Sequence, residues 1–284
     1  MSVTVKDLSH VYAEGTVFRF EALKDVSFDV GAHEFVGIIG HTGSGKSTLI
    51  QHLNRLLLPT SGTVVVNGID VTDKKVSMKE ICKRVGIVFQ YPEYQLFEET
   101  VYKDVSFGPK NLGFSEEEIE QTVRESIELV GLDYETIKDE SPFDLSGGQK
   151  RRVAIAGVLA MKPKILILDE PASGLDPMGR EEILSSIKRL NSEVGICILL
   201  VSHNMDDVAE YADRVMVFSE GRLVMYDTPR NVFADYKFME SMGLSVPQGK
   251  KVLELLKEKG VQIDTSPYTT QGAADEILRT FRKG

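Results

Sequence analysis

The sequence predicts an α/β fold that is built on a parallel sheet. Three apolar runs, at residues 36–39, 165–168 and 196–201, contain no charged side chain, which is typical of strands that are buried on both faces. Each run is followed within two residues by a side chain that can carry chemistry. Because ligands bind at the carboxyl ends of the strands in such sheets, we expect a binding site where these runs end.

The segments around these runs predict two further parts of the main domain. Residues 1–70 are predicted to form strands and hairpins, with turn signals at Gly31, Gly62 and Asn67-Gly68. A helical region follows at about 90–160. Its clearest helix begins with a capping box, in which Ser115 is followed three residues later by Glu118. Its apolar positions recur at helical spacing and end before a glycine: Ile119, Val123, Ile127, Val130 and then Gly131.

The last fifty residues differ in pattern from the rest of the chain. Residues 250–259 and 273–283 have the spacing of two short amphipathic helices, separated by a loop that contains Pro267. We therefore divide the chain into a main domain, residues 1–235, and a C-terminal appendage, residues 236–284. The candidate buried positions of the appendage are Leu253, Leu256, Ile277, Leu278 and Phe281.

Composition excludes several classes of protein. The 284 residues carry a net charge of −10, which argues against binding to nucleic acid. Every apolar run is shorter than the roughly 18 residues of a membrane span, and the first residues lack the pattern of a signal peptide. Cys82 and Cys197 offer neither a disulfide framework nor the spacing of a metal site. We expect a protein of the cytosol.

The first apolar run leads into a phosphate-binding loop of the pattern Gly-x-x-x-x-Gly-Lys-[Ser/Thr]. Its glycines let the backbone N–H groups approach a triphosphate, and the helix that begins near Lys46 adds the positive end of its dipole. Lys46 can bridge the β- and γ-phosphates, and the Ser47 hydroxyl can bind Mg²⁺. The loop consists of Gly40, His41, Thr42, Gly43, Ser44, Gly45, Lys46, Ser47 and Thr48. The sequence therefore predicts a site for ATP and Mg²⁺.

Two acidic residues follow the second apolar run. Asp169 is placed to hold the metal ion, directly or through water. Glu170 is placed to orient or deprotonate the attacking water. The alternative is an ordinary strand that ends in a solvated acidic turn, which the phosphate loop upstream makes the weaker interpretation.

A Ser-Gly-Gly-Gln element, which together with Leu145 lies 20 residues before the start of that run at Ile165, opens a helix. Its members are Ser146, Gly147, Gly148 and Gln149. Ser-x-x-Gln is also a capping box, so the element can simply start the helix. The two interpretations are compatible, because a helix N-terminus with two glycines and a hydroxyl is also an anion site. We expect it to serve the γ-phosphate of a second ATP.

Together, these motifs resemble the ATPase subunit of an ATP-binding cassette (ABC) transporter, over residues 1 to about 235. The resemblance implies an α/β, ABC-type P-loop ATPase with a RecA-like core, an antiparallel β subdomain, a helical subdomain at about 90–160 and a small α-helical C-terminal appendage. Gln90 matches the glutamine that contacts Mg²⁺ and water, and His203 matches the histidine that contacts the γ-phosphate. With Glu170, they form the implied catalytic set, and Ser47, Gln90 and Asp169 form the implied magnesium set.

The same resemblance implies that two ATPase subunits face each other head to tail. Residues 146–149 of one subunit then complete the ATP site of the other, which is a copy of this chain or a paralogue. Asp176, in Ser173-Gly174-Leu175-Asp176, matches the D-loop that crosses the dimer interface. Tyr12 resembles the aromatic residue that stacks on adenine, and Phe18 and Phe20 are the alternatives.

The segment after Gln90 narrows the resemblance. This segment is similar to the one in the ATPases of energy-coupling factor importers of vitamins and transition-metal ions, also called the cobalt/nickel CbiO type. It reads Tyr91-Pro92-Glu93-Tyr94-Gln95-Leu96-Phe97. The insertion at 15–20 resembles the second of the two paralogous ATPases of that class. The implied partners are a transmembrane coupling protein of the EcfT or CbiQ type and, indirectly, a membrane-embedded substrate-binding subunit. The implied location is the cytoplasmic face of the cell membrane.

Two features remain open at this point. Tyr91, Tyr94, Leu96 and Phe97 are expected to line a groove for a helix of the membrane partner, and ordinary core packing is the alternative. The appendage is matched in position by an extension that helps the ATPases of this class to pair, and a cap on its own chain is the alternative. The rival classes are the ATPase of a conventional ABC importer or exporter and, more remotely, an ABC ATPase outside transport.

Overall fold

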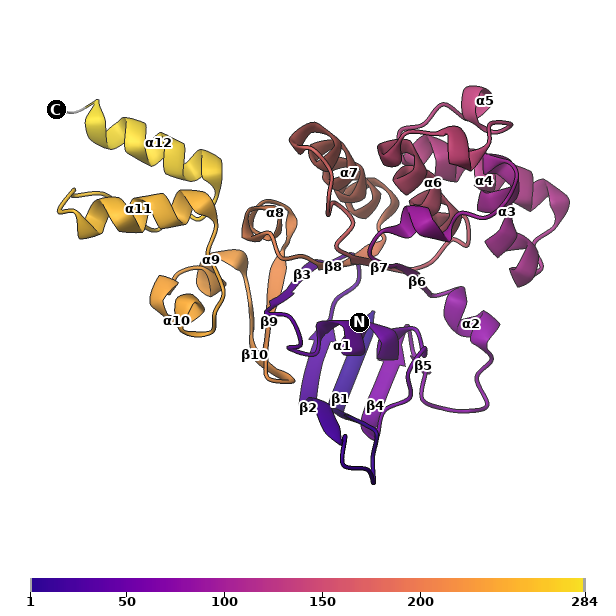
Figure 1. Ribbon diagram of the computed structural model, residues 1–284, viewed down its shortest axis with the longest axis horizontal. Coiled ribbons are helices and arrows are strands. Elements are labelled where there is room, and N and C mark those ends of the chain that lie inside the picture. Colours follow the sequence, from indigo (N-terminus) through magenta and orange to yellow (C-terminus); the bar gives the residue numbers. More distant parts are fainter. Residues whose placement is uncertain (1, 283–284) are drawn as a thin grey trace.

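The computed structural model describes residues 2–282 and arranges them as two sheets with helices around them (Figure 1). The strands are β1 (Val3–Tyr12), β2 (Phe20–Val30), β3 (Phe35–Gly40), β4 (Ser61–Val66), β5 (Ile69–Asp70), β6 (Val85–Val88), β7 (Ile165–Asp169), β8 (Cys197–Val201), β9 (Arg214–Ser219) and β10 (Arg222–Asp227). The helices are α1 (Lys46–Leu53), α2 (Met78–Cys82), α3 (Val101–Leu112), α4 (Glu116–Leu129), α5 (Tyr134–Ile137), α6 (Gly147–Leu159), α7 (Pro177–Arg189), α8 (Met205–Tyr211), α9 (Pro229–Val232), α10 (Tyr236–Ser241), α11 (Gln248–Glu258) and α12 (Thr270–Phe281).

The three apolar runs form neighbouring parallel strands, as predicted. They are β3, β8 and β7 in a six-stranded sheet of order β10-β9-β3-β8-β7-β6. All residues of β8 are buried, and so are all of β3. β3 pairs in parallel with β8, and β8 pairs with β7 through Asp169 and Val201. The carboxyl ends of these strands therefore lie side by side, which brings Gly40, Asp169 and the segment after Val201 together.

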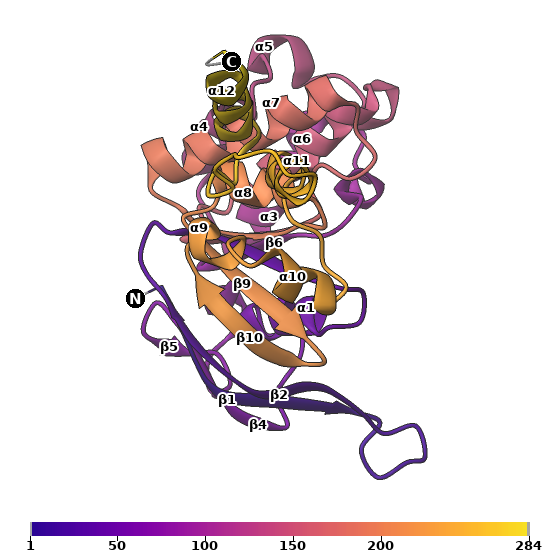
Figure 2. The same ribbon diagram turned by 90° about the vertical axis from the view of Figure 1, so that its left-hand side faces the viewer.

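A second, antiparallel sheet confirms the hairpins predicted over residues 1–70. Its order is β2-β1-β4-β5. Helix α1 lies between this sheet and the parallel one (Figure 1). One core cluster joins them, because it contains Val5 of β1, Leu49 of α1 and Val36 of β3. Figure 2 shows the long loop between β1 and β2 projecting from the end of this sheet.

The predicted helical region covers the other side of the parallel sheet with α3, α4, α5 and α6 (Figure 1). The capping box is present at the start of α4, where Ser115 and Glu118 each accept a hydrogen bond from the other's backbone N–H. The predicted apolar positions Ile119, Val123 and Ile127 are buried in a core cluster that also contains Leu166 of β7. This shared core fixes the helical region against the strand that carries Asp169.

The C-terminal segment has two parts that differ in packing. Met239 of α10 and Val246 lie in the same core cluster as Val217 of β9. Helices α11 and α12 form a hairpin that stands at the edge of the molecule (Figure 1). Of the apolar positions predicted to be buried, Leu253 is fully buried, but Leu278 and Phe281 are exposed. None of the helices within residues 2–282 combines the length and the apolar character that crossing a membrane requires.

Candidate functional site

The phosphate loop joins β3 to α1, and close contacts explain two of its glycines. A Cβ atom on Gly40 would lie 2.5 Å from the carbonyl oxygen of Phe218. A Cβ atom on Gly45 would lie 2.7 Å from the carbonyl oxygen of Ala22, and the φ of Gly45 is +106°. Side chains at these positions would clash with neighbouring backbone, so the curled loop requires glycine there.

Lys46 lies inside the curve of the loop. Its Nζ donates hydrogen bonds to the carbonyl oxygens of Gly40, at 2.6 Å, and of His41, at 3.0 Å. The residue is 6% exposed. Burial lowers the pKa of the Lys46 ammonium, while the charges of Glu170 and Asp169 act to raise that pKa. The loop thus holds a cation next to the two acidic residues.

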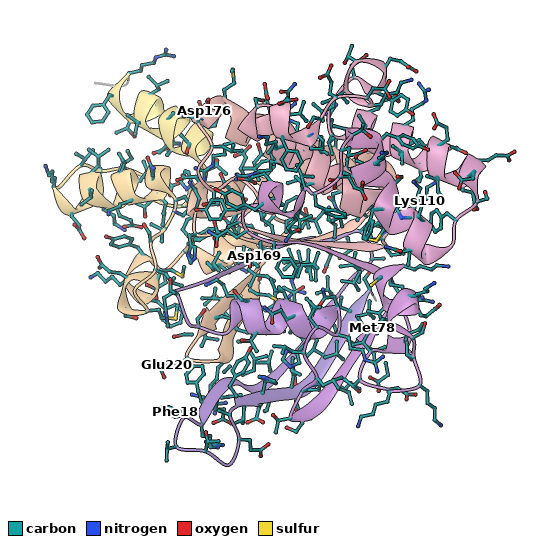
Figure 3. All side chains as sticks on the ribbon, turned by 45° about the vertical axis from the view of Figure 1, so that its right-hand side comes forward. Phe18, Met78, Lys110, Asp169, Asp176 and Glu220 are labelled. Carbon is teal, nitrogen blue, oxygen red and sulfur yellow. The ribbon has the colours of Figure 1, made fainter. Side chains whose placement is uncertain are left out.

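A cavity of about 390 Å³ brings most of the predicted site residues together. Five separate segments supply its walls: the start of β2, the phosphate loop, Gln90, the end of β7 with Glu170, and the end of β8 with the segment after it. Its lining residues are Phe20, Ala22, Thr42, Gly43, Gly45, Lys46, Ser47, Thr48, Gln90, Asp169, Glu170, Val201 and His203. Figure 3 shows Asp169 near the centre of the molecule, between the helices and the lower sheet.

Glu170 and His203 face each other at one wall of this cavity. Glu170 Oε1 lies 3.6 Å from His203 Nε2. This oxygen is buried and accepts no hydrogen bond from residues 2–282. Burial, and then the charge of Asp169, raise the pKa of Glu170 to about 7. Burial, and then the charge of Lys46, lower the pKa of His203. A carboxyl group with a pKa near neutrality is suited to act as a general base.

The residues predicted to bind magnesium fit that ion. Ser47, Gln90 and Asp169 all line the cavity and offer a hydroxyl, an amide oxygen and a carboxylate. Magnesium prefers such oxygen ligands and usually shares its shell with substrate phosphates and water. Burial raises the pKa of Asp169, and Lys46 acts to lower it. A divalent cation at this position would favour the ionised carboxylate.

The Ser146–Gln149 element starts α6 and does not contribute to the lining of this cavity. Ser146 Oγ accepts a hydrogen bond from the Gln149 backbone N–H, and Gln149 Oε1 accepts one from the Ser146 backbone N–H. The predicted capping box is therefore present. A Cβ atom on Gly147 or Gly148 would meet no atom within 4 Å. Packing within residues 2–282 does not account for these two glycines.

The three aromatic residues considered for the adenine contact lie at different distances from the phosphate loop and the cavity. Phe20 lines the cavity, whereas Tyr12 is its cross-strand neighbour in β1. Tyr12 is tied to the phosphate loop instead, with its hydroxyl 3.3 Å from Thr48 Oγ1. Phe18 lies at the outer tip of the β1–β2 loop (Figure 3) and is 81% exposed. Of the three candidates for the adenine contact, Phe20 is thus the one that the cavity presents, and Tyr12 stays a prediction.

The D-loop lies beside the acidic wall. Asp176 caps α7, because its Oδ1 accepts a hydrogen bond from the Gly179 backbone N–H at 2.7 Å. A second cavity, of about 290 Å³, runs from Glu170 and His203 to Ser173, Gly174 and Leu175. Figure 3 places Asp176 on the helical side of the molecule, away from Phe18.

An apolar groove of about 440 Å³ lies beside the helical region. It is lined mainly by α2, α3, α6 and the segment after the 3₁₀ turn at Pro92–Gln95, including Met78, Leu96, Phe97, Phe107 and Met161. Two of the four predicted groove residues, Leu96 and Phe97, are therefore at this site. Tyr91 and Tyr94 are not among its lining residues, and Tyr94 is 84% exposed.

Sequence reasoning missed two groups beside the site. His10 and His52 form a buried pair beneath Tyr12, with His52 Nε2 3.2 Å from His10 Nδ1. Arg151, in α6, binds Glu93 and the loop after Glu170. Neither group has a linear spacing that would reveal it, because each pair joins residues more than 40 positions apart.

Comparisons with known proteins agree with this site. The ABC transporter family model matches residues 23–173. Energy-coupling factor transporter ATP-binding protein EcfA2 of Caldanaerobacter subterraneus subsp. tengcongensis is 55% identical to the chain, covering 99% of this chain and 98% of that protein. The structure of cbiO1 from Clostridium perfringens, part of the ABC transporter complex cbiONQ, covers 90% of this chain and 98% of its own at 38% identity, with a TM-score of 0.76.

A third comparison concerns assembly. A dimeric, post-hydrolysis state of the ATP-binding cassette MJ0796, bound to ADP and Pi, covers 80% of this chain and 98% of its own at 30% identity, with a TM-score of 0.69. The fold and the site define an ABC-type ATPase. The chain belongs to the ABC transporter family, among the energy-coupling factor transporter ATP-binding proteins. Its similarity to EcfA2 also confirms the prediction of the second paralogue type.

Proposed function

We propose that this chain hydrolyses ATP as one half of a head-to-tail ATPase pair and thereby powers an energy-coupling factor importer. One observation carries the proposal. The phosphate loop lines a cavity, whereas Ser146–Gln149 presents a helix N-terminus elsewhere, with two glycines that packing among residues 2–282 does not require. Such a helix start is an anion site, which a second subunit's nucleotide would complete.

The mechanism assigns tasks to the phosphate loop and to the polar side chains around it. The loop N–H groups and Lys46 bind the phosphates, and Glu170 accepts a proton from the attacking water. His203, next to Glu170, contacts the γ-phosphate, and Gln90 helps to position the water. Ser47, Gln90 and Asp169 would hold Mg²⁺, which would neutralise phosphate charge when bound. Residues 146–149 of the partner close the site over the γ-phosphate.

Partners and location follow from the same proposal. The second ATPase is a paralogue or another copy, and the membrane partner is a transmembrane coupling protein that holds this chain at the cytoplasmic face of the membrane. The apolar groove with Leu96 and Phe97 is the candidate contact with that partner, because it lies just after the Gln90 segment. The solute of such an importer is a vitamin or a transition-metal ion. Another subunit binds it, since the cavity of this chain is fitted to a nucleotide.

The test replaces the proposed general base while keeping its size. Glu170→Gln should lower ATP turnover by at least a hundredfold, because the amide cannot accept the proton from water. ATP should still bind, since Lys46 and the loop are intact. The variant should therefore accumulate as an ATP-bound dimer, detected by its mass in solution with MgATP. Phosphate release at the wild-type rate would refute the role of Glu170.

The dimer itself needs a separate control. Ser146→Arg in the Glu170→Gln background should prevent dimer formation, because the large cation blocks the surface that a γ-phosphate must approach. ATP binding to the single chain should persist. A dimer of unchanged stability would contradict the head-to-tail arrangement.

A further inference from the structure

Arg151 connects three segments of the site, although it lines none of the nucleotide cavity. It lies in α6, two residues after Gln149, and its side chain is 3% exposed. One edge of its guanidinium group binds Glu93, with Nε 3.1 Å from Oε2 and Nη2 2.7 Å from Oε1. Its Nη1 donates to the carbonyl oxygens of Pro171, at 3.1 Å, and Ser173, at 2.6 Å.

The partners of Arg151 lie in the segments that directly follow Gln90 and Glu170. Glu93 lies three residues after Gln90, in the 3₁₀ turn Pro92–Gln95. Pro171 and Ser173 follow Glu170 and lead into the D-loop. One side chain therefore joins the segments that follow Gln90, Gln149 and Glu170, each of which carries part of the proposed reaction.

The chemistry of the contact favours a rigid link. A guanidinium group is planar and can bind a carboxylate with two parallel hydrogen bonds while it donates others to carbonyl groups. Burial alone would raise the pKa of Glu93, but hydrogen bonds and charge from Arg151 hold it below the usual value, so the pair is ionised at neutral pH. A buried ion pair gives little net stability compared with apolar packing, which argues for a role in holding a defined geometry.

We propose that Arg151 is a positioning residue that makes the Gln90 turn, the start of α6 and the D-loop move as one body. When the membrane partner displaces the segment around Phe97, Arg151 passes that displacement to Ser146–Gln149 and to Ser173–Asp176. The inference rests on the proposed function, because it is the second subunit's ATP that residues 146–149 complete.

The test uses the full chain in its ATPase pair and compares Arg151→Lys, Glu93→Gln and the double variant. Arg151→Lys keeps the charge but cannot form the two-pronged bond and reach both carbonyls. Each single variant should lower kcat at least tenfold, with KM for ATP and ATP binding by the single chain within twofold of wild type. The double variant should lose no more than the worse single variant, because both changes break the same link.

The control variant is Arg124→Gln. It removes another arginine–glutamate pair of the helical region, Arg124 with Glu135 at 2.7 Å, which touches no motif. Its kcat should stay within twofold of wild type. An unchanged kcat in a folded Arg151→Lys protein would overturn the inference, and so would a loss of kcat matched by an equal loss of ATP binding. Ser146→Arg then separates the two proposals. If kcat is unchanged in Arg151→Lys and the pair also keeps its ATPase activity with Ser146→Arg, both the inference and the proposed function fail. If Ser146→Arg abolishes that activity, only the role of Arg151 fails.

Discussion

At the scale of single residues, His10 and His52 form a buried pair that connects Tyr12 to the end of the phosphate loop. His52 Nδ1 lies 2.7 Å from the Thr48 carbonyl oxygen and therefore donates to it, which leaves Nε2 to face His10. The rings of His10 and Tyr12 pack edge to face at 4.4 Å. The pair thus links the phosphate-loop helix α1 to strand β1 and holds Tyr12 beside Thr48.

This pair predicts a dependence of stability on pH. Burial lowers the pKa of His10 and of His52, although each makes a hydrogen bond to a backbone carbonyl that opposes the shift. In the unfolded chain both titrate near 6.5. The unfolded state therefore binds more protons just below that value, so the free energy of unfolding should fall as the pH drops below about 6.5, by at most about 1.4 kcal/mol per pH unit for each histidine.

The His52→Gln variant tests this prediction, since glutamine can still donate to Thr48 but does not titrate. It should be about 1 kcal/mol less stable at pH 8, and its stability should fall less steeply between pH 7 and 5.5. Denaturant titrations at several pH values measure both quantities. His33→Gln, which removes an exposed histidine, is the control. Equal slopes for wild type and His52→Gln would contradict the prediction.

At the scale of elements, the segment from Gln90 to Phe97 connects the nucleotide cavity with the apolar groove beside α3 and α6. Phe97 is 56% exposed and packs edge to face on Phe107 at 5.0 Å. Leu96, next to it, is buried in the core below. The segment that begins at Gln90 therefore has one end at the cavity and the other on an apolar surface.

The Phe97→Asp variant should lose its association with the membrane subunit, because a carboxylate in an apolar contact is costly to desolvate. ATP binding should be unchanged, since Phe97 does not line the nucleotide cavity. Co-purification of the assembled complex from membranes measures the association. Val194→Asp places the same charge on another exposed apolar residue and should co-purify normally. Retention of Phe97→Asp in the complex would show that the groove is not the contact.

Elements with strong local signals could be predicted from the sequence. The parallel strands were visible as apolar runs, and the starts of α4 and α6 as capping boxes, because each signal depends on neighbouring residues. The link from Arg151 to Glu93 and the pair of His10 with His52 could not be predicted, because tertiary packing brings them together. That Phe20 lines the cavity while Tyr12 lies opposite it depends on the β1–β2 register, which the sequence leaves open in an irregular hairpin.

At the scale of the whole molecule, the C-terminal segment changes character near residue 247. Up to Val246 it packs in the core cluster with β9 and α8. Beyond it, the α11–α12 hairpin meets the main body partly through Asp206, whose Oδ1 accepts hydrogen bonds from the Gln248 backbone N–H at 2.9 Å and from Thr270 Oγ1 at 3.4 Å. We therefore propose that the separable part begins at residue 247, about a dozen residues after the boundary expected at 235.

The exposed apolar side chains of this hairpin predict a role in pairing. Leu278 is 50% exposed and Phe281 is 59% exposed, although the helical spacing marks them as positions that should be buried. A second ATPase subunit would cover them. Deleting residues 247–284 in the Glu170→Gln background should raise the dimer dissociation constant at least tenfold, measured as mass in solution with MgATP.

Because the deletion also removes Tyr268, which packs on the core cluster, a second variant separates pairing from folding. Leu278→Asp replaces an exposed side chain, so the melting temperature should change little while the dimer weakens in the same direction as in the deletion. Val252 lies on the neighbouring helix α11 and is 45% exposed. The Val252→Asp variant tests whether the contact with the second subunit includes that helix. A Leu278→Asp dimer as stable as the parent would mean that the hairpin covers its own chain and takes no part in pairing.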